Sequence, residues 1–172
     1  MASLIENLVE ILNGEDSEYQ KLIDLSNKKS EAIVHEDLDL LSKVTTEEQE
    51  IVSVITNLEN QRSDAMAKIA RILNTDVAGL KLDLLISLLN KSPKEQKDLS
   101  AVHDKLHNTL HEMKLVNERN EELLKNAIDM VNFNMNLIQS MKKAPETANY
   151  GRGAYNTGNT LGTDSGNFDA RQ

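Results

Sequence analysis

Three histidines in the last third of the chain come closest to a pattern with chemical function. His103, His107 and His111 recur every fourth residue, so they share one helix face, where two imidazoles could bind a divalent metal. A zincin-type site also needs a glutamate in reach, and Glu112 points to another face of the helix. The histidines flank the apolar stripe that contains Leu106, and there they face mostly water. The spacing therefore predicts a solvated row, with no metal site and no cofactor.

The other patterns on which catalysis depends are absent from the sequence. The chain has no cysteine, no strand pattern, and no glycine-rich loop after a strand that could hold a phosphate. Its carboxylates are scattered over helix surfaces, and a metal-loaded helical bundle would need Glu-x-x-His pairs, which do not occur. The sequence therefore predicts that the protein is not an enzyme.

Composition and charge narrow the possible partners. Only 3% of the 172 residues are aromatic and none is tryptophan, which disfavours a thick globular core. The net charge is −9, whereas nucleic acids and anionic membranes both attract basic surfaces. The most apolar stretch, 80–89, is too short for membrane insertion, and Met1–Leu12 has no positively charged signal region. We expect a cytoplasmic protein that binds neither nucleic acid nor membrane.

Apolar residues spaced alternately three and four positions apart predict long helices. The first two are joined by a link of three residues, 35–37, in which Asp37 is a plausible N-cap. So short a link requires an antiparallel hairpin. Thr45 and Thr46 resemble a second capping signal inside the second helix, and we expect a continuous helix with a bend there. Four charged residues interrupt the two apolar seams, so neither is an ideal coiled coil; they are Glu15, Lys29, Glu48 and Arg62.

The two prolines of the chain, Pro93 and Pro145, bracket a third, much longer helix. Ser92 and Glu95 can form a capping box around Pro93, whose missing N–H costs nothing at a helix start. Roughly 50 residues then extend about 75 Å at 1.5 Å per residue, so the C-terminal end of this helix should extend beyond the hairpin. Residues 80–89 are leucine-rich and predict a short connecting helix that plugs one end of the bundle.

The predicted fold is all-α, an elongated antiparallel helical bundle or coiled coil. It consists of the hairpin, the connecting helix and the very long C-terminal helix, over residues 1–144. Residues 145–172 form a Gly- and Asn-rich tail that should be disordered when alone. Its three aromatics, Tyr150, Tyr155 and Phe168, suit either a solvated tail or a segment that folds on binding a partner.

The third helix has more apolar surface than one seam requires. Two adjacent apolar rows widen its stripe after Val116, and this part should lack an intramolecular partner. Asparagine is also dense there, although its helix propensity is mediocre. At Asn120 and Asn134 it falls inside the seam, where a buried amide needs a partner. These amides either set the register of the bundle, face solvent, or receive backbone groups of a bound protein helix.

Two stretches of the chain resemble the FlgN-type flagellar export chaperones. The first is HEDLDLL at 35–41, leading through TEEQE at 46–50 to LENQR at 58–62. The second is VNERNEELL at 116–124, leading to IDMVNFNMNLI at 128–138. The tail adds NYG at 149–151, which is similar to a Tyr-Gly sequence after the last helix of that family.

This resemblance implies a cytoplasmic chaperone that binds unassembled hook–filament junction (hook-associated) proteins and prevents their premature assembly. It also implies delivery of these clients to the flagellar export gate, with Tyr150 foremost, and Tyr155 and Phe168, as candidate gate contacts. The exposed stripe would bind an amphipathic client helix. The candidate client-binding residues are Asn117, Asn120, Leu123, Leu124, Ala127, Met130, Val131, Asn134, Leu137, Ile138 and Met141.

A structural or tethering coiled-coil protein is the alternative. It would share the helices but should show longer unbroken heptads than these interrupted seams. The sequence leaves open which junction protein is preferred, whether the protein is a monomer or a dimer, and whether the last helix folds back, swaps between chains or frays. It also leaves open whether the row of His103, His107 and His111 binds a metal.

Overall fold

The computed structural model describes residues 2–76, 80–90 and 92–142, and within them every regular element is a helix. These are α1 (Ala2–Val34), α2 (Leu38–Leu73), α3 (Leu82–Leu88) and α4 (Pro93–Lys142), which confirms the predicted all-α class and the long last helix. The chain divides into two compact units, 1–134 and 135–172. The described part of the second unit is the end of α4. The predicted helix stop at Pro145, the 144/145 boundary and the tail lie outside the described residues.

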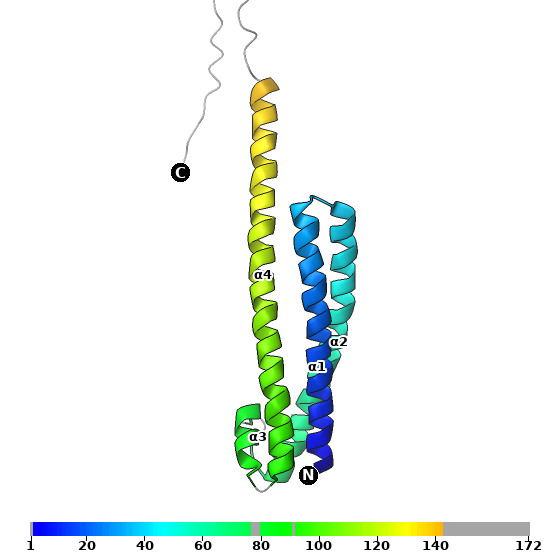
Figure 1. The fold of residues 1–172 in the computed structure, drawn as a ribbon, viewed down its shortest axis with the longest axis vertical. Coiled ribbons are helices and arrows are strands. Elements are labelled where there is room, and N and C mark those ends of the chain that lie inside the picture. Colours follow the sequence, from blue (N-terminus) through cyan, green and yellow to red (C-terminus); the bar gives the residue numbers. More distant parts are fainter. Residues whose placement is uncertain (1, 77–79, 91, 143–172) are drawn as a thin grey trace, which may run out of the picture. The chain divides into compact units, whose positions relative to one another are not determined.

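Helices α1 and α2 form the predicted antiparallel hairpin, and α4 lies beside α1 within the first unit (Figure 1). The turn between α1 and α2 is capped on both sides. The Asp37 carboxylate accepts a hydrogen bond from the Leu40 N–H at 2.9 Å, which confirms Asp37 as the N-cap of α2. On the α1 side, the Asp37 N–H donates to the Ala32 carbonyl at 2.9 Å, while Glu36 adopts the left-handed conformation with φ 56°.

Helix α2 is continuous through Thr45 and Thr46. Their hydroxyls donate to the carbonyls of Leu41 and Ser42, four residues earlier, at 2.8 and 3.0 Å. This is how threonine bonds inside a helix rather than at its start. The capping signal in the sequence therefore marks no new helix.

Helix α3 closes the end of the bundle at which α1 and α4 begin (Figure 1). Leu80, Leu85 and Leu89 are buried there in one cluster with residues of α1, α2 and α4, among them Leu8 and Leu99. Fully burying one such side chain contributes about 1.5–3 kcal/mol, so this cluster is a major source of stability. The prediction that residues 80–89 plug one end is confirmed.

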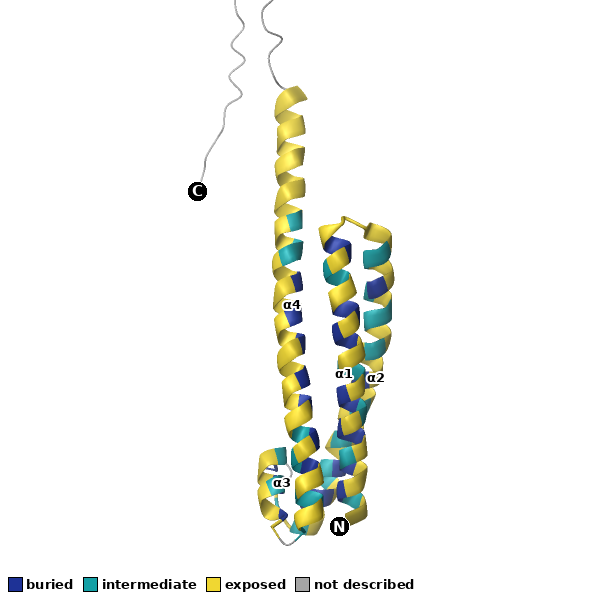
Figure 2. Ribbon diagram, in the orientation of Figure 1, coloured by how far each residue is buried: buried dark blue, intermediate teal, exposed yellow. Residues whose placement is uncertain are grey.

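A second, smaller cluster joins the three long helices farther along. It contains Leu22 and Ile23 of α1, Ile55 of α2, and Met113 and Val116 of α4. The last buried residue among those described in α4 is Asn120, and the ribbon of α4 changes from buried to exposed beyond this level (Figure 2). The packed part of α4 is thus its first half.

Candidate functional site

The charged residues that interrupt the two seams pair with each other across the hairpin. Arg62 Nη1 lies 2.9 Å from Glu15 Oε2, and Lys29 Nζ lies 2.7 Å from Glu48 Oε2. Each pair joins α1 to α2. The interruptions are therefore cross-links within the hairpin, and they oppose the sliding of one helix along the other.

Glu15 is the most deeply buried of these groups, with a relative exposure of 0%. Burial raises the pKa of its carboxyl group, and the nearby Arg62 guanidinium opposes that rise. Among the described residues, its second oxygen, Oε1, has no hydrogen-bond partner. Glu15 is therefore held in place at an energetic cost, which links the stability of the hairpin to pH.

Polar contacts also fix α4 against α1 at two levels. At the first, the Thr109 hydroxyl donates to Asp16 Oδ1 at 2.6 Å, and Lys105 Nζ lies 2.8 Å from Asp16 Oδ2. At the second, Asn120 Nδ2 donates to the Ser26 carbonyl at 2.8 Å. The Ser30 hydroxyl donates to Asn120 Oδ1. Both polar ends of the Asn120 amide are therefore used inside the bundle.

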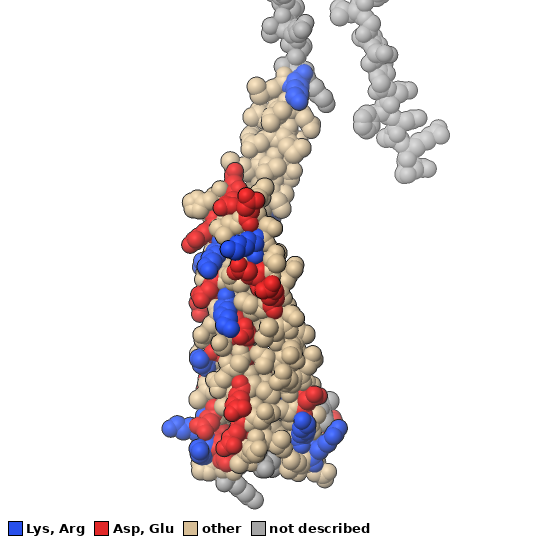
Figure 3. Space-filling view, turned by 90° about the vertical axis from the view of Figure 1, so that its right-hand side faces the viewer, with Lys and Arg blue, Asp and Glu red and all other residues tan. Residues whose placement is uncertain are grey.

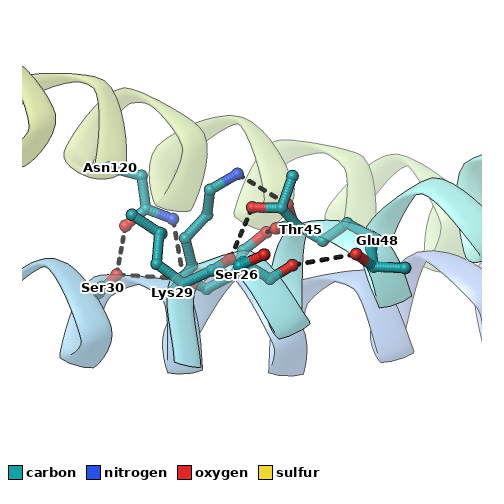
Figure 4. A network of polar contacts seen from close by, with 9 residues as sticks. Ser26, Lys29, Ser30, Thr45, Glu48 and Asn120 are labelled. Atoms are coloured by element: carbon teal, nitrogen blue, oxygen red, sulfur yellow. Dashed lines mark hydrogen bonds and ion pairs between the residues drawn. The ribbon is translucent and has the colours of Figure 1, made fainter. Parts of the chain in front are cut away.

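The contacts of Asn120 belong to a network that spans three helices (Figure 4). The Ser26 hydroxyl donates to Glu48 Oε1 at 3.0 Å, and Glu48 also accepts from Lys29. The structure thus gives Asn120 the register-setting position that the sequence allowed. With 5% of its surface exposed, Asn120 is not accessible to a partner in this conformation. We therefore do not propose it as a client contact.

The remaining candidate residues of α4 lie on a surface that becomes progressively more exposed. Leu123, Leu124 and Ala127 are half-buried. The others are exposed, namely Asn117, Met130, Val131, Asn134, Leu137, Ile138 and Met141. From Met130 to Met141 the helix carries no charged side chain, and the uncharged surface is visible near the end of α4 (Figure 3). The candidate aromatics Tyr150, Tyr155 and Phe168 lie outside the described residues.

A groove lies between the α1–α2 turn and α4, with a volume of about 390 Å³. We call it the turn groove. Most of its lining is apolar and comes from both sides: Ala32, Ile33, Leu38 and Leu41 from the hairpin, and Leu124, Ala127, Ile128 and Val131 from α4, with Glu36 and Asn132. The groove therefore brings three of the predicted client-binding residues, Leu124, Ala127 and Val131, together with hairpin residues that the sequence did not predict.

Sequence reasoning missed three further apolar residues on α4. Ile128, Phe133 and Met135 are exposed, but they lie outside the two apolar rows that were traced along the helix. The helix signals in the sequence do not indicate the hairpin half of the groove. Leu38 directly follows the Asp37 cap, so its position predicts the start of a helix rather than part of a binding surface. A signal was present, since Val34 and Leu38 are apolar residues beside a turn that nothing in the predicted fold covers.

The histidine row lies apart from this surface. The ring of His103 is 3.5 Å from Asp83 of α3 and 3.4 Å from its neighbour Asp104. Within residues 2–76, 80–90 and 92–142, no group of three or more histidines and carboxylates is arranged to hold a metal ion. Over the same residues, no helix is long and apolar enough to cross a membrane.

Comparison with known proteins decides the family. The FlgN protein family matches residues 1–157. The chain belongs to the FlgN family. A relative in Bacillus subtilis (strain 168), described as "Uncharacterized protein YvyG", is 24% identical over 121 residues, which cover 70% of this chain and 71% of that protein. No solved structure matches the chain significantly.

Membership of the FlgN family supports a role as a flagellar export chaperone, and this is not a family of enzymes. The asparagine-rich stretch that carries the resemblance spans a packed part and an exposed part of α4. Its beginning contains Asn120, which fixes the helix in the bundle. Its later part, from Ile128 onward, is the exposed apolar surface. In this FlgN chain, one stretch of sequence therefore carries both the anchoring of α4 and the surface that is exposed among the described residues.

Proposed function

We propose that this chain is a cytoplasmic export chaperone that binds unassembled hook–filament junction proteins through α4 and delivers them to the flagellar export gate. The observation that supports this most is the exposed, uncharged segment Met130–Met141. Exposed apolar surface of this kind marks a protein-binding site. An amphipathic helix of the client, laid along α4, would cover it.

The client surface would consist of apolar side chains with asparagines between them. Val131 and Ile138 are more than half exposed, at 56% and 53%, and they lie seven residues apart, on the same face of the helix. Asn134 lies between them, and its amide can receive a polar group of the client. Such a surface binds and releases a helix without requiring a matched charge at every position.

Binding to purified junction proteins tests this proposal. Val131→Asp and Ile138→Asp should each weaken binding by about tenfold or more, since a buried charge without a partner is costly. Val52→Asp is the matched control, because Val52 is exposed on α2 and lies outside the proposed surface. Unchanged affinity in both α4 variants, with folding intact, would contradict the proposal.

The tail is proposed as a second contact, for the export gate. Deletion of residues 145–172 should reduce client export while leaving the melting temperature of the helical part nearly unchanged. Tyr150→Ala tests the foremost candidate by itself. Normal export by the truncated protein would eliminate the tail from the delivery step.

A further inference from the structure

We propose that the turn groove is a second binding surface for the client, and that it selects an amphipathic helix whose apolar stripe is flanked by lysine or arginine. This inference rests on the proposed function and assigns a role to hairpin residues outside α4. It predicts a chemical property of the client helix that the surface of α4 alone does not specify.

The geometry of the groove fits the apolar face of a helix. Leu38 stands at one wall with 75% of its surface exposed, and Ile128 stands on the α4 side with 59% exposed. Both line the same groove of about 390 Å³. A helix docked there would cover apolar side chains of α1, α2 and α4 together, and would continue the packing that ends near Asn120.

Charge around the groove decides which helix fits. Residues 31–42 carry no lysine or arginine, and they contain four carboxylates, Glu31, Glu36, Asp37 and Asp39. Acidic side chains are visible around the turn end of the hairpin, with basic side chains farther down the bundle (Figure 3). Glu36 is the one charged residue among those lining the groove in the described structure. An acidic rim attracts basic side chains that flank an apolar stripe.

The same charge argues against two other occupants. A second copy of this chain would bring its own acidic rim to the groove, and each copy carries a net charge of −9. Residues 145–172 contain three acidic and two basic residues, so they do not supply a basic flank either. A partner with basic residues is therefore favoured.

The backbone conformation of Glu36 explains how a glutamate comes to line the groove. Within the described residues, only Glu36 and Asn74 have positive φ without being glycine, at 56° and 54°. Asparagine tolerates this conformation, whereas glutamate does not favour it and glycine would be the usual choice. The left-handed conformation of Glu36 closes the C-terminal end of α1, and Glu36 is thereby one of the residues that line the groove.

Two synthetic helical peptides test the proposal with the full-length chain. They share one leucine and alanine stripe, and their flanking positions carry lysine in one and glutamate in the other. Fluorescence anisotropy at low salt should show the lysine-flanked peptide binding at least ~10-fold more tightly, with the difference decreasing at high salt. Equal binding of the two peptides would overturn the proposal.

Matched variants locate the binding. Glu36→Gln should weaken the lysine-flanked peptide by roughly twofold to fivefold, and Glu50→Gln, the same change on exposed α2 surface, should not. Leu38→Ala should weaken it by about tenfold, and Val52→Ala should not. Glu36→Gly separates a loss of binding from a loss of folding, because this variant should bind the lysine-flanked peptide more weakly while its melting temperature rises. Affinities equal to those of the controls would overturn the assignment.

The remaining outcomes separate this inference from the proposed function. If Leu38→Ala and Glu36→Gln bind junction proteins normally while Ile138→Asp does not, the turn groove is excluded and the role of α4 stands. If the wild-type chain binds no junction protein, the proposed function fails. The two peptides and the matched variants then still test whether the turn groove binds a helix flanked by basic residues. Sedimentation should show a monomer over the concentrations used. A dimer that Leu38→Ala dissociates would identify a second copy as the occupant and overturn the proposal.

Discussion

The two ends of the bundle contain similar apolar residues, but among the described residues only one end is filled. At the plugged end, α3 and the segments beside it place Leu80, Leu85 and Leu89 against the three long helices. At the turn end, the hairpin closes with a three-residue link, and the apolar side chains of Leu38 and Ile128 remain exposed. The difference is the presence of a covering element rather than a difference in helix type.

The same contrast divides α4 into a packed part and an exposed part, to which we assign stability and client binding respectively. The part of α4 before Asn120 contributes buried side chains to both core clusters. The part after Asn120 contains no buried residue among those described. Substitutions in the first part should therefore change the free energy of unfolding, and substitutions in the second should change partner binding. Four predictions test this division, in order of decreasing effect.

The same substitution at two leucines of α4 gives the largest contrast. Leu99 is fully buried, and Leu99→Ala should lower the free energy of unfolding by about 2–5 kcal/mol, through lost burial and the cavity left behind. Leu137 is 48% exposed, and Leu137→Ala should change it by no more than about 0.5 kcal/mol. Urea unfolding followed by circular dichroism measures both. Similar losses at the two positions would contradict the division.

Asparagine to alanine at two positions tests where the division lies. Asn120→Ala removes one partner of the Ser26 carbonyl and one of the Ser30 hydroxyl, which also bond to each other, and should cost about 1–3 kcal/mol. Asn134→Ala should be neutral or slightly stabilising, because alanine is the better helix former. Thermal unfolding distinguishes them. For junction-protein affinity we expect a direct effect at Asn134, and unchanged affinity there would eliminate its proposed amide contact.

A pH series tests the polar links that hold the packed region. Burial raises the pKa of Glu15 in the folded chain above its ordinary value of 4.5, so the folded state binds this proton more tightly than the unfolded state. The stability associated with Glu15 is therefore full below pH 4.5 and decreases as the pH rises through the folded pKa. Glu15→Gln should remove that decrease. Unfolding curves of the two proteins that keep a constant separation from pH 4 to 7 would refute this effect.

The smallest expected effect is a gain in stability at the turn end. Glu36→Gly relieves a left-handed glutamate, and should raise the free energy of unfolding by about 0.5–1 kcal/mol, reduced by the greater freedom of glycine in the unfolded chain. The control is Glu50→Gly, within α2, which should be destabilising by roughly 1 kcal/mol. Chemical denaturation measures both changes. A loss of stability in Glu36→Gly would show that the glutamate supports the turn.

Much of the fold was predictable because its determinants are local. The spacing of apolar residues predicted the helices, the Asp37 cap predicted the start of α2, and Pro93 predicted the start of α4; each is confirmed. Thr45 and Thr46 resemble a second capping signal, but the continuous helix predicted there is confirmed, because a threonine hydroxyl can bond inside a helix as well as at its start. Local sequence does not distinguish these two uses without the neighbouring carbonyls.

The candidate site was predictable only in its α4 part. An apolar row on one helix, such as Leu124 and Val131, can be predicted from the spacing of the residues. The position along the helix at which a partner helix stops covering that row cannot be predicted in this way. Asn120 and Asn134 have equivalent positions in the apolar seam of the sequence. Ser26 and Ser30, some ninety residues earlier in the chain, make one of them a buried bundle contact while the other remains exposed.

The helices, the Asp37 cap, the acidic turn and the uncharged stretch from Met130 to Met141 follow from the sequence alone, because they depend on residues close together in the chain. The tertiary structure decided which seam residues pair, which asparagine is buried, and that Leu38 and Ile128 line one groove. These outcomes depend on the axial register of helices far apart in the sequence. That register is set by side-chain packing and by buried polar contacts between helices, and neither has a local pattern.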